Sequence, residues 1–131
     1  MSPVDGVNWR CPDRVLLMLL HDECQAQHGG VAGVRDRGAL ERVLAQLRSI
    51  RGDLVDCAAA RITHLLRVRP FLGGHLRAAL LDADLFLRLN GHVLVAPPAR
   101  LAAVMQAMAA TEIGEPELAC WMRDHVQHRD S

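Results

Sequence analysis

The residues best suited to chemistry lie in one short stretch, RPFLGGHLR, at residues 69–77. Arg69 and Arg77 flank a glycine pair and a histidine where a long apolar run begins. Such a run predicts a helix, and the free amides of a helix N-terminus favour anions. Arginine adds paired donors that match phosphate oxygens. The stretch therefore indicates a phosphate or nucleotide site, with Gly74, His75, Arg77 and Arg69 as candidate ligands.

These residues also have an interpretation without a ligand. Arg77 would then brace the interior of the protein, and Arg69 would be a solvated side chain; both interpretations stay open. His75 is a candidate for a displaced general base. We expect instead an exposed histidine in the first helical turn, where the positive end of the helix would disfavour its charged form.

The other histidines and the cysteines give weak signals for metal. His21 stands beside Asp22 and Glu23, but no other histidine is one helical turn away from them, so we predict no metal site. His64 is expected to be a hydrogen-bonded structural histidine. The four cysteines contain no C-x-x-C pair and are expected to be reduced core thiols. Five further residues have no predicted role in chemistry. His125 and His128 are expected on a solvated face, and Trp121, Met105 and Met108 in core or interface packing.

The composition is typical of one globular domain over residues 1–131, with 50% hydrophobic and 23% charged residues. Fifteen basic and fifteen acidic side chains cancel, which argues against general electrostatic binding of nucleic acid. The chain has no lysine, which excludes a lysine nucleophile and a P-loop. The N-terminus has no signal-peptide pattern, and no apolar run is long enough to span a membrane, so we expect a cytoplasmic protein without a membrane partner.

Helical periodicity predicts the elements that would position these residues. The first expected helix has Pro12 in its first turn, runs over 15–27 and stops at Gly29-Gly30. The others are one capped by Asp36, one capped by Asp53 that ends at Arg69-Pro70, one over 74–89, one from Pro97-Pro98, and one with Pro116 as its first residue that turns Val126 inward. Residues 92–95 are expected to be an extended edge segment. The helix over 74–89 is apolar over most of its circumference. The sequence therefore predicts an all-α bundle of about six helices around a hydrophobic central helix.

Two stretches resemble the Doc (death-on-curing) branch of the Fic/Doc family. The first, LHDECQAQHGGVAGVRDRGALE, is similar to a family opening in which H-[DE] leads into GG-x-x-G-x-R-D-x-G-x-L-E. The second, THLLRVRPFLGGHLRAALLDADLFLRLNG, is similar to the active-site segment H-x-F-x-[DE]-G-N-K-R and the apolar helix after it. The tail ATEIGEPELACWMRDHV resembles the family's last helix. The resemblance covers nearly the whole chain and implies the Fic fold.

The resemblance also implies a chemistry, the transfer of a phosphate-containing group from a nucleotide to a hydroxyl of a target protein. The Fic branch generally transfers AMP. The Doc branch is a bacterial toxin that phosphorylates elongation factor Tu and is neutralised by an antitoxin. In that mechanism the motif histidine is the general base, the acidic residue holds magnesium, and the glycine, asparagine and arginine hold phosphates.

This chain departs from the family motif at four positions. Arg69 stands at the histidine, Gly73 at the acidic residue, His75 at the asparagine and Leu76 at the lysine. A guanidinium cannot accept a proton at neutral pH, and glycine has no side chain to hold a metal. Losing a general base alone typically costs about 10²–10⁴ in rate. We therefore expect no efficient transfer and no magnesium held by the motif.

Three hypotheses follow from the sequence. In the first, the chain is a degenerate Doc-like protein related to toxin–antitoxin systems. It would bind a partner, such as an antitoxin-like peptide or a second copy of itself, or a phosphate ligand such as ATP or another nucleotide. In the second, it is a residual or rewired transferase toxin, with His75 or His64 replacing the lost base and a target such as elongation factor Tu. In the third, it is a helical structural module without activity.

Overall fold

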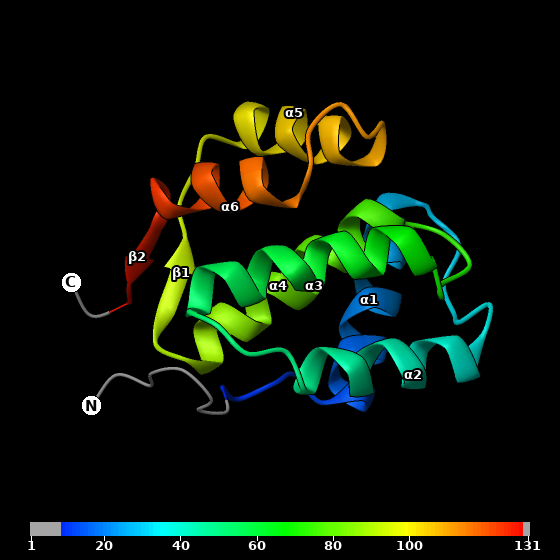
Figure 1. Cartoon of the computed structure of the whole chain (residues 1–131). Helices are drawn as coiled ribbons and strands as arrows, with labels where there is room; N and C mark the ends of the chain where they lie inside the picture. The colour runs from blue at the N-terminus through cyan, green and yellow to red at the C-terminus, as the bar shows by residue number, and fades with distance from the viewer. Residues whose placement is uncertain (1–8, 130–131) are drawn as a thin grey trace.

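The structure is a computed structural model that describes residues 9–129 (Figure 1). This part of the chain forms six helices and two short strands, which confirms the predicted all-α architecture of about six helices. In chain order the elements are α1 (Arg14–His28), α2 (Arg37–Arg48), α3 (Leu54–Val68), α4 (His75–Leu89), β1 (His92–Leu94), α5 (Pro98–Ala109), α6 (Glu115–Arg123) and β2 (Val126–His128). Within these described residues, no helix combines the length and the hydrophobicity that crossing a bilayer requires.

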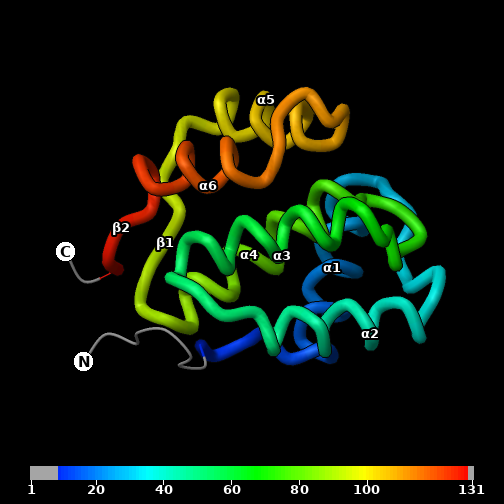
Figure 2. Tube along the Cα trace, in the orientation of Figure 1, coloured from blue at the N-terminus to red at the C-terminus, as the bar shows by residue number. Residues whose placement is uncertain are grey.

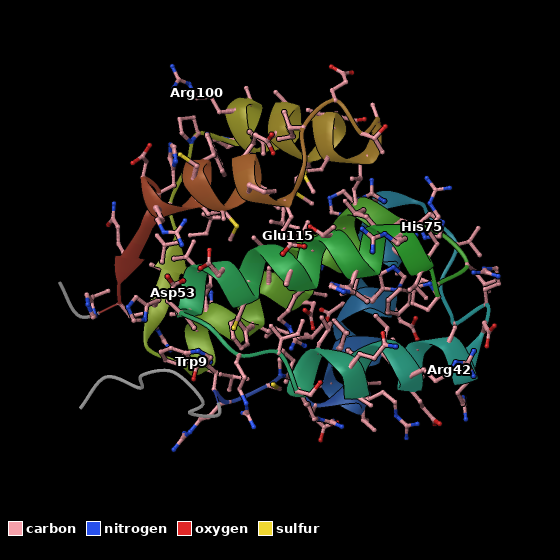
Figure 3. The ribbon with its side chains drawn as sticks, viewed as in Figure 1. Trp9, Arg42, Asp53, His75, Arg100 and Glu115 are labelled. Carbon is pink, nitrogen blue, oxygen red and sulfur yellow. The ribbon has the colours of Figure 1, made fainter. Side chains whose placement is uncertain are left out.

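The helices lie in three layers, with α3 and α4 in the middle (Figures 1 and 2). α5 and α6 cover one side of this pair, and α1 and α2 cover the other. Asp53, just before α3, and His75, which begins α4, lie at opposite ends of the pair (Figure 3). The predicted central helix is therefore one member of an antiparallel central pair.

Small side chains are frequent on the buried faces of α3 and α4. The buried alanines of the two helices are Ala58, Ala59 and Ala60 in α3, and Ala78, Ala79 and Ala83 in α4. The distance between two packed helices depends on the side chains at their contact, so alanine permits a close approach. Larger apolar side chains such as Ile62 and Phe86 fill the remaining space.

Aspartate caps begin three of the helices. Asp36 accepts from the Ala39 amide at 2.9 Å, and Asp53 accepts from the Asp56 amide at 2.8 Å, both as predicted. Asp13 caps α1, so Pro12 precedes the helix instead of lying in its first turn. In α6, Gly114 is the cap and Pro116 is therefore the second helical residue.

The end of the chain differs from the prediction. Val126 does not extend the sixth helix, because α6 ends at Arg123 and Val126 begins β2. β2 pairs antiparallel with β1 and satisfies the backbone of the extended edge segment. His125 is not solvated: it is half-buried, and its ring stacks on Trp121 at 4.2 Å. A three-residue strand carries too little periodicity to be recognised in sequence.

The four cysteines are free. Cys57 is buried, and burial, with help from the charges of Asp53 and Asp56, raises the pKa of its thiol to about 11. Cys120 is exposed, and the remaining two are partly buried. The prediction of core thiols therefore holds for Cys57, and in part for Cys11, which packs against the core.

Candidate functional site

The two stretches that carry the sequence resemblance pack directly on each other. The loop after α1 runs beside the corner between α3 and α4, where Val34 and Phe71 form an antiparallel bridge. The Leu72 amide donates to the Gly33 carbonyl at 3.0 Å. These contacts join residues that are far apart in sequence, and they fix the path of the corner.

Arg69 occupies this corner, as the sequence placed it. Its backbone is left-handed, with φ 52° and ψ 59°, which is costly for a residue other than glycine. Arg35 holds the turn, because its Nη2 donates to the Arg69 carbonyl at 2.6 Å and to the Val68 carbonyl at 3.3 Å. The Arg69 side chain is exposed and has no hydrogen-bond or ion-pair partner within residues 9–129. Its guanidinium is therefore available to a ligand.

Gln25 belongs to the site but was not predicted from the sequence. This α1 side chain is 1% exposed, and its Nε2 donates to the Val31 carbonyl at 2.9 Å. Its Oε1 accepts from Arg77 Nη1 at 3.0 Å. Arg77 itself is exposed, so it is not an internal brace but is held at the surface by Gln25. The available sequence signal for Gln25 was its position, because it lies one helical turn after His21 and therefore on the same face of α1.

Gly74 is required at the start of α4 for two reasons. Its backbone is left-handed, with φ 64° and ψ 42°. A Cβ at this position would also lie 2.2 Å from Oε1 of Gln25. As the cap of α4, Gly74 offers no side chain to the first amides of the helix. Within residues 9–129 the cap makes no side-chain hydrogen bond to those amides, so they can bind an anion.

His21 is fully buried beneath the corner. Its Nε2 donates to the Gly73 carbonyl at 3.0 Å, and its ring lies 4.3 Å from that of Phe71. Since Nε2 carries the proton, Nδ1 is an acceptor, and it has no partner among the described residues. Burial lowers the pKa of His21, although the Gly73 carbonyl and Asp22 act in the opposite direction. His21 is therefore held as neutral imidazole.

The neutral His21 makes stability depend on pH. The unfolded chain binds a proton near the ordinary histidine pKa of about 6.5, whereas the folded chain resists protonation. The unfolded state therefore binds more protons as the pH falls from about 7 to about 5, and the free energy of unfolding decreases. We expect the urea midpoint to fall over this interval, and to fall less in His21→Gln, which keeps a donor for Gly73.

The matched control for His21 is His28→Gln, an exposed residue of the same helix, which should keep the wild-type pH dependence. His75 would contribute to the slope in the same direction, because its pKa is lowered too. Identical pH dependence in His21→Gln and the wild type would contradict the assignment of His21.

His75 is half-buried, not the exposed histidine predicted from the sequence. Its Nδ1 is buried and has no hydrogen-bond partner in the part of the chain that is described. Burial and then the positive charges of Arg69 and Arg35 lower the pKa of its imidazole. His75 therefore offers a neutral ring at the N-terminal end of α4 (Figure 3). His64, by contrast, is a structural histidine whose Nδ1 lies 2.7 Å from the Ala60 carbonyl.

A groove of about 730 Å³ lies beside this corner. We call it the basic groove, and it is lined by Leu66, Arg69, Gly74, His75, Leu76, Arg77, Leu80, Pro98, Leu101, Ala102, Met105, Gln106 and Ala109. Its cationic side chains come from the corner and the first turn of α4, and its apolar wall includes Leu80, Leu101 and Met105. No aspartate or glutamate is among these described lining residues. The groove therefore favours a ligand that is both anionic and partly apolar.

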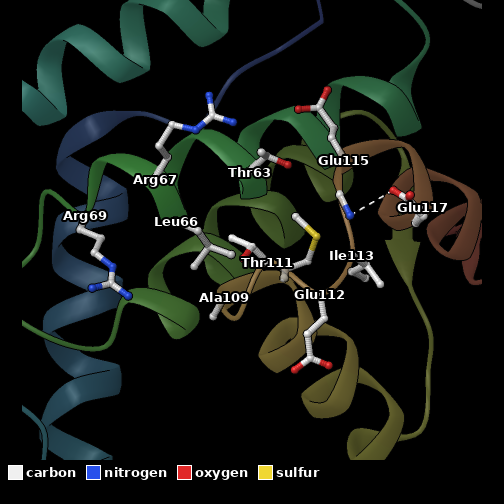
Figure 4. Close-up of a pocket in the computed structure, with 12 residues that line it drawn as sticks. Thr63, Leu66, Arg67, Arg69, Ala109, Thr111, Glu112, Ile113, Glu115 and Glu117 are labelled. Carbon is white, nitrogen blue, oxygen red and sulfur yellow. Dashed lines mark hydrogen bonds between the residues drawn. The ribbon is translucent and has the colours of Figure 1, made fainter.

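A second groove of about 540 Å³ adjoins the first and shares Leu66, Arg69 and Ala109 with it. We call it the mixed-charge groove. Figure 4 shows its charged residues around a floor of apolar side chains, with Arg67 and Arg69 on one side and Glu112, Glu115 and Glu117 on the other. One carboxylate oxygen of Glu117, Oε2, already accepts a hydrogen bond from the Gly114 amide at 3.0 Å. Charges of both signs suit a peptide better than a phosphate.

The magnesium ion that the sequence resemblance implies does not fit this corner. Gly73 has no side chain, and its carbonyl accepts from buried His21. Magnesium is usually held by carboxylates, and the described lining of the basic groove has none. Two of the three residues His21, Asp22 and Glu23 already have partners, because His21 donates to the Gly73 carbonyl and Asp22 accepts from the Gly33 amide, each at 3.0 Å. Within residues 9–129, no group of three or more histidine, cysteine or acidic side chains is placed to hold a metal.

Comparison with known proteins does not assign the chain to a family. No family model matches the sequence, and no curated protein is significantly similar to it. The likeness to Fic/Doc proteins therefore stays a hypothesis that depends on the two stretches described above.

Proposed function

We propose that this protein binds a phosphate-bearing ligand of the nucleotide type in the basic groove and does not transfer its phosphate groups. The observation that supports this most is the lining of the groove. Its ionisable side chains within the described residues are Arg69, His75 and Arg77, and they lie beside the free amides that follow Gly74. Phosphates bind at helix N-termini and to arginine, and the apolar wall suits a nucleobase.

Binding without transfer follows from the two residues at the corner. Arg69 has five donors and no acceptor, so it cannot take the proton from an attacking hydroxyl. Gly73 supplies no carboxylate to neutralise charge through a metal, on which phosphoryl transfer depends. The chain would then act as a degenerate Doc-like protein that works by binding and not by transfer.

An antitoxin-like peptide is the partner that this proposal includes. The mixed-charge groove supports it, because an amphipathic helix could pack its apolar face on Leu66 and Ile113 there. Arg67 and Arg69 would pair with acidic side chains of the peptide, and Glu112 and Glu115 with basic ones.

Calorimetry with ADP tests the proposed binding. We expect heat of binding with and without magnesium, and a loss of about tenfold or more in affinity in Arg77→Ala and in Arg69→Gln, because hydrogen bonds to charged groups contribute about 1.5–3 kcal/mol. Arg100→Gln is the matched control, since this exposed arginine of α5 does not line the groove. Absence of heat, or equal losses in all three variants, would contradict the proposal and favour a helical structural module.

A rewired transferase is the second candidate, and the state of His75 favours it. His75 lines the basic groove with a lowered pKa, and a neutral imidazole there could accept a proton from a target hydroxyl. Incubation with radiolabelled ATP and elongation factor Tu separates the two candidates. If the protein binds without transfer, we expect no labelled product. Transfer of label that disappears in His75→Gln would instead establish the transferase.

A further inference from the structure

We propose that the β1–β2 ribbon carries a binding site for a divalent transition metal ion, formed by His92 and His128. The two residues are direct cross-strand partners in the antiparallel pair. Side chains at such positions share one face of the ribbon, with Cβ atoms about 4.5–5.5 Å apart. Their rings are already in contact, with centroids 4.3 Å apart and planes tilted by 39°.

The tautomer of His92 is fixed in the form that binds metal. Its Nδ1 lies 2.8 Å from the Asn90 carbonyl and therefore donates its proton there. Nε2 is then left with a free lone pair. Histidines that bind metals usually donate their second ring nitrogen to a carbonyl or carboxylate in this way, which orients the ring.

His128 is exposed, and its ring makes no hydrogen bond to the described residues, so either nitrogen can turn towards the metal. Two nitrogens bound to one tetrahedral ion at about 2.0–2.1 Å lie about 3.3 Å apart. The exposed His128 ring would turn from the observed contact to reach that spacing. The neighbouring Arg129 donates from Nη1 to the Arg88 carbonyl at 3.2 Å.

The donor set defines the class of ion. Two neutral imidazoles suit Cu²⁺, Ni²⁺ and Zn²⁺, whereas Mg²⁺ and Ca²⁺ prefer oxygen ligands. No third protein ligand is grouped with this pair within residues 9–129, so solvent would complete the coordination. Occupancy would tie β2 to β1 at the opposite end of the molecule from the basic groove (Figures 1 and 3). The site is therefore independent of the proposed nucleotide binding.

Isothermal titration with ZnCl₂ and NiCl₂ at about pH 7.5 tests the site. We expect one equivalent of each ion to bind, and MgCl₂ to give no heat. His128→Gln, at an exposed position that should not affect folding, is expected to lower the affinity by about tenfold or more, and His92→Gln likewise. His28→Gln removes an exposed histidine elsewhere and should bind as the wild type does.

A stability measurement gives a second readout. Zinc should raise the melting temperature of the wild type and of His28→Gln, because it binds only the folded ribbon, but should not raise that of His128→Gln. Slower hydrogen exchange of the β2 amides with zinc would locate the effect. No binding to the wild type, or equal binding by wild type and His128→Gln, would overturn the proposal.

Discussion

Replacing Asp82 by alanine is expected to lower the free energy of unfolding by about 3–5 kcal/mol. Asp82 is fully buried in α4 and receives two bonds from Arg61 of α3, Nε to Oδ2 at 2.6 Å and Nη2 to Oδ1 at 2.9 Å. Burial disfavours the charge on Arg61, but Asp82 more than offsets this and raises the pKa of the guanidinium. Without Asp82, a cation would be left unpaired between the two central helices.

Urea denaturation measures this loss, and the same helix offers a control. Asp84→Ala breaks the exposed pair between Asp84 and Arg88, one turn apart, which should cost only about 0.3–0.5 kcal/mol. A domain of ordinary stability has about 5–15 kcal/mol in total, so the two variants should be easy to tell apart.

A double replacement separates the stability lost by leaving the Arg61 charge unpaired from the stability lost through poorer packing. The combination of Arg61→Met with Asp82→Leu removes both charges and keeps the apolar contact with Phe86, over whose ring the guanidinium lies at 5.1 Å. Such replacements of a buried pair are often neutral or stabilising. We therefore expect the double variant to be more stable than Asp82→Ala. Similar losses in Asp82→Ala and Asp84→Ala would contradict the role given to the pair.

The elements that local chemistry determines could be predicted from the sequence. Asp36 and Asp53 cap helices because their side chains reach amides three residues further along the chain. Gly29 ends α1 in the left-handed conformation that a glycine after a helix signals. In each case the partners lie within a few residues, so the sequence contains the whole interaction.

Polar groups that pair across the fold could not be predicted in the same way. Asp82 lies in a helix that the sequence marks as apolar, and its partner Arg61 is 21 positions away. Gln25 and Arg77 are 52 positions apart. Nothing in either local segment specifies such a partner, because the pairing depends on how the helices pack.

The candidate site contains one feature that could be predicted from the sequence and one that could not. The corner at Arg69 could be placed from sequence, because proline disfavours a helical conformation in the residue before it. The burial of His75 could not, because it depends on how neighbouring elements pack around the start of α4. The prediction that His75 is exposed was therefore wrong. The prediction that its charged form is disfavoured agrees with the lowered pKa, for which burial is the main cause.

The second large effect is expected for Gly74→Ala. An alanine with φ near 64° is strained by about 1–3 kcal/mol. Its Cβ would also lie 2.2 Å from Oε1 of Gln25, and Gln25 is buried and held by hydrogen bonds at both ends of its amide. Displacing a well-packed side chain costs about a further 1–3 kcal/mol. The variant should also lose ADP affinity, since Gln25 positions Arg77.

Gly29→Ala separates the two contributions to this loss, because Gly29 has a similar φ of 74° but an alanine Cβ there would meet nothing within 4 Å. It should show the strain alone and keep ADP binding. Adding Gln25→Ala to Gly74→Ala relieves the clash, so the double variant should be more stable than the sum of the two single losses predicts. Its ADP affinity should stay low, because Arg77 has lost its hydrogen-bond partner. Equal destabilisation by Gly74→Ala and Gly29→Ala in urea would mean that Gln25 yields freely. The close packing of α1 against the corner would then not be what holds the proposed phosphate site in place.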